Sequence, residues 1–202
     1  MRNRLSKTDR RTMILDAAAA LFAAKGVDGT EMEDIRQACG ISRGGLYHHF
    51  ANRRDVLDGL VDREISALAR VLDDESQSPL PAILRAGSGH LGAETGLLSA
   101  LRTGADRQDY LAAVDTALIR HVAPRLALRL RGQVRDGVDP EHVAELFLTV
   151  NAHINRRQIL GHWDNRAAAA FAGTALRALA PLLADPDQLT PMISTLAGKD
   201  AP

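Results

Sequence analysis

Apolar residues recur at three- and four-residue intervals along most of this 202-residue chain. That spacing places them on one face of an α-helix, whereas a β-strand requires apolar and polar positions to alternate. No sustained alternation is present in the sequence. We therefore predict an all-α fold. The clearest helical repeats lie at residues 14–22, 57–72, 143–154 and 171–183.

Residues that favour helix ends divide these repeats into separate helices. Thr30, followed three residues later by Glu33, has the pattern of a capping box. Asp139 before Pro140 places a cap residue ahead of proline at the first helical position. Glycines that suit helix C-caps stand at positions 26, 40 and 137.

These signals together predict nine helices, with the longest bent near Pro124. The tail after Asp185 contains three prolines and is expected to be loosely ordered. The predicted helices cover residues 8–25, 31–38, 42–49, 53–74, 80–92, 94–103, 107–135, 140–161 and 165–184.

Charge is unevenly distributed along the chain, although its 25 basic and 25 acidic residues balance. Residues 1–55 hold ten Lys and Arg against seven Asp and Glu, and five of these basic residues lie within the first eleven positions. Such polarity is typical of a surface that meets a polyanion. The basic N-terminal arm is either a DNA-contacting arm or only a solubilising tail.

Cys39 is the only cysteine, so an intrachain disulfide is excluded and a cytoplasmic location is expected. No stretch approaches the ~18 apolar residues that span a bilayer, so no membrane partner is predicted. The basic start and the alanine-rich run after it look like a signal peptide. However, Asp16 and Lys25 interrupt and close that run. We expect an amphipathic helix that stays on the protein.

Two short predicted helices, 31–38 and 42–49, are joined by the turn Cys39-Gly40-Ile41. Short helices connected by three residues that include glycine have the helix-turn-helix pattern. In that motif the second helix enters the major groove of DNA. Leu46 and Phe50 share one face of the second helix and are expected to anchor it in the core.

The other side of this second helix has residues suited to DNA. Arg43 can make the bidentate contact that recognises guanine. Gly44 and Gly45 let the helix backbone approach phosphates and base edges. Tyr47 and His48 can reach oxygens of the DNA backbone, although a solvated position is the alternative for Tyr47.

The stretch TMILDAAAALFAAKGVDGTEMEDIRQACGISRGGLYHHFANRRDVLDGLV, residues 12–61, resembles the DNA-binding region of the tetracycline-repressor (TetR) family of bacterial transcriptional regulators. The resemblance includes Gly40-Ile41-Ser42 and Leu46-Tyr47 and has no gap. Gly45 departs from the Thr, Ser or Ala common in the family. Arg36 replaces a small residue, and its charge lies either near DNA or in solvent. These two departures leave the operator sequence open.

The resemblance, together with the residue chemistry, defines the predicted DNA-binding set. Arg53, which opens the next helix, is expected to hold a phosphate. The predicted DNA-binding residues are Thr30, Ser42, Arg43, Gly44, Gly45, Tyr47, His48 and Arg53.

The resemblance also implies a three-helix DNA-binding domain at 1–52 and a larger helical domain for effector binding and dimerisation at 53–202. It implies a homodimer paired through helices 140–161 and 165–184. It implies a repressor that leaves a palindromic operator when a small effector binds, as the helix 53–74 swings.

Polar residues within apolar helical stripes are the candidates for effector binding. Asn151 interrupts one stripe, His121 follows another, His90 lies one turn before Glu94, and Trp163 is the only indole. Each of them fits a hydrogen-bonded core or interface group equally well.

Two other functions are weighed against DNA binding. An enzyme is suggested by Gly87-Ser-Gly-His-Leu-Gly92, but a dinucleotide fingerprint needs a preceding strand, and PLPAILRA does not read as one. We therefore predict no enzyme and no cofactor. A helical protein-interaction module without specific DNA binding is the remaining alternative. No metal site is predicted, because the adjacent His48 and His49 point about 100° apart on a helix.

Overall fold

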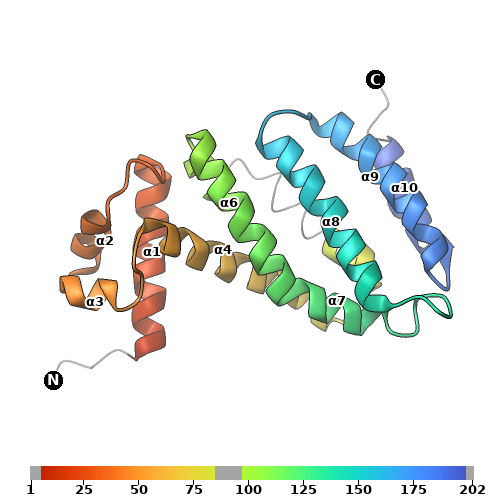
Figure 1. The fold of residues 1–202 in the computed structure, drawn as a ribbon, viewed down its shortest axis with the longest axis horizontal. Helices are drawn as coiled ribbons and strands as arrows, with labels where there is room; N and C mark the ends of the chain where they lie inside the picture. Colours follow the sequence, from red (N-terminus) through yellow and green to blue (C-terminus); the bar gives the residue numbers. More distant parts are fainter. Residues whose placement is uncertain (1–5, 85–96, 199–202) are drawn as a thin grey trace. The chain divides into compact units, whose positions relative to one another are not determined.

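The computed structural model describes residues 6–84 and 97–198, and within these ranges it contains helices and turns but no β-strand. The predicted all-α fold is confirmed (Figure 1). The chain forms two compact units, residues 1–64 with 93–114 and residues 65–92 with 115–202. The predicted domain boundary after residue 52 stays a prediction.

The first unit contains a helix with well-defined ends, α1 (Lys7–Lys25). The Ser6 hydroxyl accepts a hydrogen bond from the Asp9 amide at 3.0 Å, and the Asp9 carboxylate accepts one from the Ser6 amide at 3.3 Å. This capping box satisfies two backbone donors at the helix start. Gly26, with φ of +85°, ends the helix as predicted.

Around α1 lie the short helices α2 (Met32–Cys39) and α3 (Arg43–Tyr47) and the start of α4 (Arg53–Ala69). Phe22, Ile35 and Leu46 have no exposed surface, because each points into the space between these helices. The unit is completed by the 3₁₀ turn Leu97–Ala100 and by the first part of α6 (Gly104–Ala117).

Within the first unit, residues 97–114 are joined to the N-terminal helices by polar contacts as well as by packing. The Val27 amide donates to the Ala100 carbonyl at 3.0 Å. The Arg54 guanidinium lies 2.6 Å from the Asp109 carboxylate. The side chain of Tyr110 is 1% exposed. A segment far along the chain therefore stabilises the N-terminal helices.

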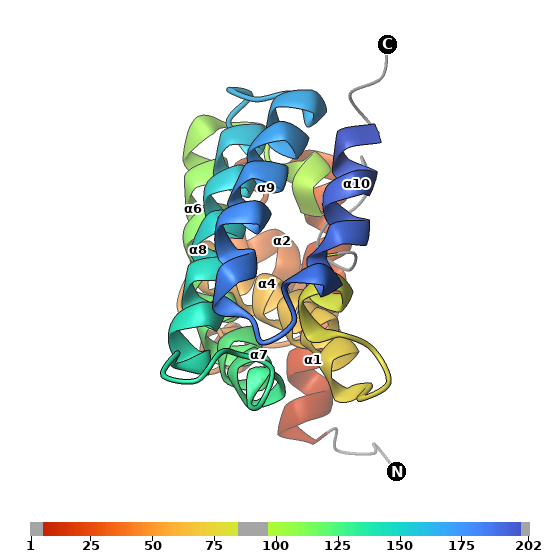
Figure 2. The ribbon, with the colours of Figure 1, turned by 90° about the vertical axis from the view of Figure 1, so that its right-hand side faces the viewer.

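The second unit is built mainly from α7 (Ala123–Leu130), α8 (Pro140–Ile159), α9 (Asn165–Leu179) and α10 (Thr190–Gly198). Helices α8, α9 and α10 lie side by side (Figures 1 and 2). As predicted, Asp139 caps α8, where its carboxylate accepts from the Glu141 amide at 2.8 Å. Short 3₁₀ turns lie at Arg70–Asp73, Ala180–Leu182 and Pro186–Leu189.

The region predicted as one helix over 107–135 has a different course. Helix α6 ends at Ala117, a π-helical turn follows at Leu118–Val122, and α7 ends at Leu130. Pro124 has no amide hydrogen to donate to the preceding turn, so the helical pattern changes next to it. The predicted bend is thus a wider turn, and Gly137 lies in a loop with φ of +82°.

Two further predictions about ordered segments are wrong. The described part of the tail after Asp185, residues 186–198, is ordered, because Leu189 is fully buried and Leu196 packs against Ile154 and its neighbours. The described part of the predicted helix 94–103 is only a 3₁₀ turn at Leu97–Ala100.

The predicted capping box at Thr30 is displaced by one residue. The N-cap of α2 is Glu31, whose amide donates to the Asp34 carboxylate at 3.0 Å. Thr30 is fully buried, and its hydroxyl donates to the Gly26 carbonyl at 2.8 Å. Thr30 therefore closes the loop after α1 instead of starting α2.

No helix among the described residues has the length and hydropathy that crossing a lipid bilayer requires.

Neighbouring residues of α3 provide a direct test of this packing. Leu46 is fully buried and Tyr47 is 43% exposed. Leu46→Ala should lower the free energy of unfolding by about 2–5 kcal/mol, because it leaves a cavity under α3. Tyr47→Ala should change it by less than about 1 kcal/mol. Urea unfolding of both variants measures the difference, and equal losses would contradict the assigned packing.

Candidate nucleic-acid interface

Helices α2 and α3 are joined by a tight turn, as the sequence predicts. Gly40 adopts the left-handed conformation with φ of +61°, and its amide donates to the Gln37 carbonyl at 3.1 Å. Ser42 then caps α3, where its hydroxyl accepts from the Gly45 amide at 3.1 Å. A glycine at the C-cap and a serine at the next N-cap together fix the path of the turn.

Arg36 connects α2 to this turn. Its Nη1 donates to the Ile41 carbonyl at 2.9 Å. Its Nε and Nη2 donate to the two carboxylate oxygens of Glu33 at 2.9 and 2.7 Å. The hydrogen bonds from Arg36 and Gln37 lower the pKa of Glu33 to about 2. Arg36 therefore holds Ile41, the residue before the Ser42 cap of α3.

One face of α3 is buried and the opposite face is open. Leu46 is fully buried, whereas Arg43, Gly44 and Tyr47 are exposed. The Arg43 guanidinium carbon lies 5.6 Å from the centre of the Tyr47 ring, so the two side chains lie together. His48, in the turn after α3, is also exposed. The structure thus brings four of the predicted residues to one small surface.

The two glycines of α3 differ in what they allow. A Cβ added at Gly44 would meet nothing within 4 Å, so the helix backbone is open to a large ligand there. A Cβ added at Gly45 would lie 3.2 Å from the Ser42 hydroxyl oxygen that caps the helix. Gly45 therefore relieves crowding at the cap, while Gly44 leaves the surface flat.

Two predicted DNA-binding residues have contacts within the protein. The Arg53 Nη1 donates to the Asp28 carbonyl at 2.6 Å and lies 3.5 Å from the Thr30 carbonyl. Thr30 is fully buried. These contacts tie the start of α4 to the loop before α2. A DNA contact from either residue stays a prediction.

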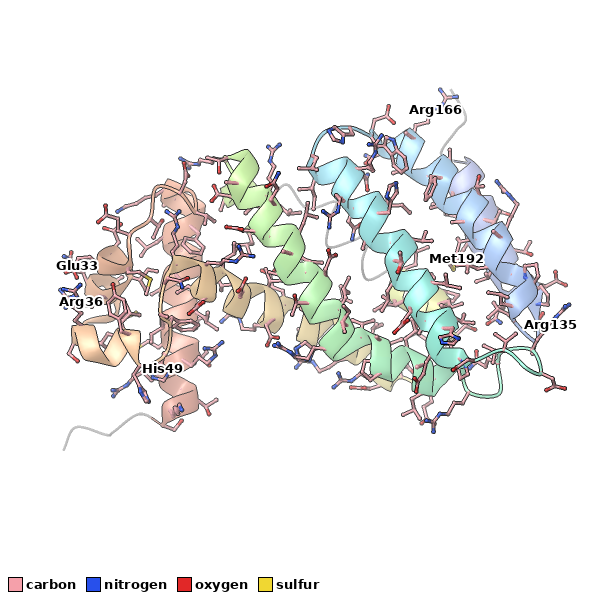
Figure 3. The ribbon with its side chains drawn as sticks, in the orientation of Figure 1. Glu33, Arg36, His49, Arg135, Arg166 and Met192 are labelled. Atoms are coloured by element: carbon pink, nitrogen blue, oxygen red, sulfur yellow. The ribbon has the colours of Figure 1, made fainter. Side chains whose placement is uncertain are left out.

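His49 lies beside the first turns of α1, and the sequence reasoning did not include it among the DNA-binding residues (Figure 3). Partial burial lowers the pKa of His49, and the positive charges of His48, Lys7, Arg10 and Arg11 lower it further. The spacing of Lys7, Arg10 and Arg11 places them on one face of α1, which is the signal that points to a shared surface.

The predicted effector-binding residues are placed as follows. His121 is half-buried in the π-helical turn, and its carbonyl accepts from Arg125 at 2.8 Å. Asn151 is half-buried on α8. Trp163 lies before α9, with its ring 5.1 Å from that of Phe171. His90 lies outside the described residues. Their binding of an effector stays a prediction.

The segment that suggested an enzyme, residues 87–92, also lies outside the described residues. Residues 79–84, which precede it, are helical, whereas a dinucleotide fingerprint follows a strand. Within the described ranges, no three His, Cys, Asp or Glu side chains are grouped as a metal site requires.

Arg36→Met should loosen α3 without unfolding the protein, because it removes the hydrogen bond to the Ile41 carbonyl. We expect faster amide hydrogen exchange in residues 44–50, with exchange in α8 and α9 unchanged. Arg54→Met is the matched control, since it removes an arginine paired with Asp109 outside the turn. Equal exchange in α3 of the wild type and Arg36→Met would contradict the role given to Arg36.

Residues 14–60 match the family model described as bacterial regulatory proteins, tetR family. A 55-residue segment is 46% identical to the HTH-type transcriptional repressor KstR2 of Rhodococcus jostii and covers 27% of each chain. A 74-residue segment is 40% identical to KstR2 of Mycobacterium tuberculosis and covers 35% of this chain and 37% of that protein. The chain therefore aligns with about a quarter to a third of these curated relatives.

The fold extends the likeness beyond this segment. The transcriptional repressor QsdR of R. erythropolis superposes with a TM-score of 0.64 over 89% of this chain and 97% of its own, at 20% identity. That identity establishes a shared fold and nothing more specific. Residues 14–60 of this chain are thus similar to the DNA-binding segment of the tetR family of bacterial regulatory proteins.

Proposed function

We propose that this protein is a sequence-specific DNA-binding transcriptional regulator, and that it represses genes from a palindromic operator until a small effector releases it. One observation carries the proposal. Arg43, Gly44 and Tyr47 form an exposed face on a short helix that the buried Leu46 anchors to the core, and His48 is exposed in the turn that follows. Such a face, on the second helix of a helix-turn-helix, suits the major groove.

The residues of this face have two proposed roles, which are recognition of bases and positioning of the protein on the DNA backbone. Arg43 supplies a planar donor pair that matches the two acceptors of guanine in the major groove. Tyr47 and His48 supply polar groups for phosphate oxygens, which carry no sequence information. Open space at Gly44 lets the helix backbone come close to the bases. Phosphate contacts make such binding weaken as salt concentration rises.

The names of the relatives support repression rather than activation, because both aligned KstR2 proteins are described as transcriptional repressors. The aligned segments cover the DNA-binding region of this chain. An effector is supported less directly, by the second helical unit with its half-buried His121, Asn151 and Trp163. DNA binding also supports the expected cytoplasmic location, where a bacterial operator lies.

We further propose a homodimer formed through α8 and α9. Leu146 on α8 is 48% exposed and Phe171 on α9 is 38% exposed. The Phe171 ring lies 5.5 Å from that of His153, so apolar and aromatic groups of both helices lie close together. Two copies paired through this face would present two α3 helices, and such a pair is expected to bind a palindromic operator.

The remaining alternative is a helical protein-interaction module whose helix-turn-helix does not read DNA. That alternative predicts only weak, sequence-independent attraction to DNA. It gives no reason for Arg43 and Tyr47 to lie together beside an open glycine.

Arg43→Ala should lower the preference for an operator sequence over random DNA by about 1–3 kcal/mol. The duplex is first obtained by selection from a random pool, and competition with random duplex then measures the preference. Arg63→Ala is the control, since it also removes one positive charge but from an ion pair with Asp16 at 2.6 Å. Undiminished preference in Arg43→Ala would show that the readout assignment is wrong.

Leu146→Glu should convert the dimer to monomers, because it places a carboxylate in the proposed apolar contact. Leu128→Glu is the matched control, since Leu128 is 58% exposed on α7, outside that face. Sedimentation velocity distinguishes monomer from dimer. A monomeric wild type, or a Leu146→Glu variant that remains dimeric, would contradict the proposed interface.

A further inference from the structure

Two parts of the chain that are distant in sequence bring positive charge to one place. The first turns of α1 carry Lys7, Arg10 and Arg11, and the turn after α3 carries His48 and His49. His49 is labelled in Figure 3. The rings of His48 and His49 lie 5.4 Å apart in an edge-on arrangement. The Arg11 guanidinium carbon lies 4.4 Å from the centre of the Phe50 ring. The contact at Phe50 fixes α1 against the residues that follow α3.

Within the described ranges, every charged group that shifts the pKa of His49 is basic. Those groups are His48 from the turn after α3 and Lys7, Arg10 and Arg11 from α1. Asp9, in the first turn of α1, accepts a hydrogen bond from the Ser6 amide. Asp55, in the first turn of α4, accepts one from the Ala51 amide at 2.9 Å. A histidine held among basic side chains is well placed to bind an anion from outside the protein.

We propose that Lys7, Arg10, Arg11, His48 and His49 form a phosphate-binding surface, and that binding of the DNA backbone there adds a proton to His49. This inference rests on the proposed DNA binding. It assigns a function to the basic start of α1, and it adds His49 to the residues that contact DNA.

The direction of the effect follows from the charges. In the free protein, partial burial and the surrounding cations favour the neutral form of His49 and lower its pKa. A DNA phosphate beside the ring favours the charged form, so the pKa rises in the complex. Because the complex then binds more protons than the free protein, affinity must increase as the pH falls and decrease as it rises. One proton limits the change to about tenfold in the dissociation constant per pH unit for each chain.

The test measures the dissociation constant of the full-length protein for a random-sequence duplex between about pH 5.5 and 8, at fixed ionic strength. Phosphate contacts do not depend on sequence, so this probe requires no known operator. Calorimetry in two buffers of different ionisation enthalpy measures the proton uptake directly. We expect the wild type to bind more weakly as the pH rises and to take up protons on binding.

Two variants of the same position separate charge from folding. His49→Gln should bind with less proton uptake and a flatter pH profile than the wild type. His49→Lys, which carries a permanent charge, should also have a flatter pH profile of binding. It should bind DNA more tightly than His49→Gln at pH 8. Thermal unfolding confirms that each variant is folded. Because lysine and glutamine both remove the imidazole ring, tighter binding of His49→Lys would come from its positive charge and not from a structural role of the histidine.

The results that would overturn the inference are distinct from those that overturn the proposed function. The proton-linked contact would be rejected if wild-type binding did not change with pH. It would also be rejected if the dissociation constant of His49→Gln changed with pH as much as that of the wild type. If Arg43→Ala loses DNA selectivity, the proposed regulator is supported even where the proton-linked contact is rejected. Absence of DNA binding at every pH would reject both.

Discussion

The burial of Leu46 and Phe50 is the interaction on which the candidate interface depends. A five-residue helix such as α3 cannot persist alone, because helix nucleation is unfavourable and too few hydrogen bonds follow it. Leu46 is fully buried and Phe50 is 2% exposed, so packing against the first unit supplies the missing stability. Every exposed group of α3 keeps its position only because this buried face is held.

Polar contacts then define where α3 begins and the course of the chain before and after it. Arg36 holds the Ile41 carbonyl, Ser42 caps the helix, and Arg53 holds the Asp28 carbonyl. Two of the arginines in this region therefore bond to the protein itself, although charge counting treats all of them as available for DNA. Arg43 lies beside the Tyr47 ring on the open face of α3, and it is the arginine to which we assign base recognition.

Much of this architecture could be predicted, because periodicity and caps are local properties. The helices at 7–25, 32–39 and 140–159, the turn at Gly40 and the buried anchors all follow from residue type and spacing. Long-range contacts were beyond reach: the attachment of 97–114 to the N-terminal helices, the burial of Thr30, and the order of the tail through Leu189. His49 was missed for the same reason, since its neighbours on α1 are about forty residues away along the chain.

We propose that two copies of α3 read DNA as a symmetric pair. The most direct measurement is selection of a random DNA pool on the purified protein near physiological salt, followed by sequencing of the retained duplexes. We expect one motif with two-fold symmetry and half-sites about 10 base pairs apart, or a multiple of that spacing. Retention without a shared motif would contradict the regulator and favour a helical interaction module.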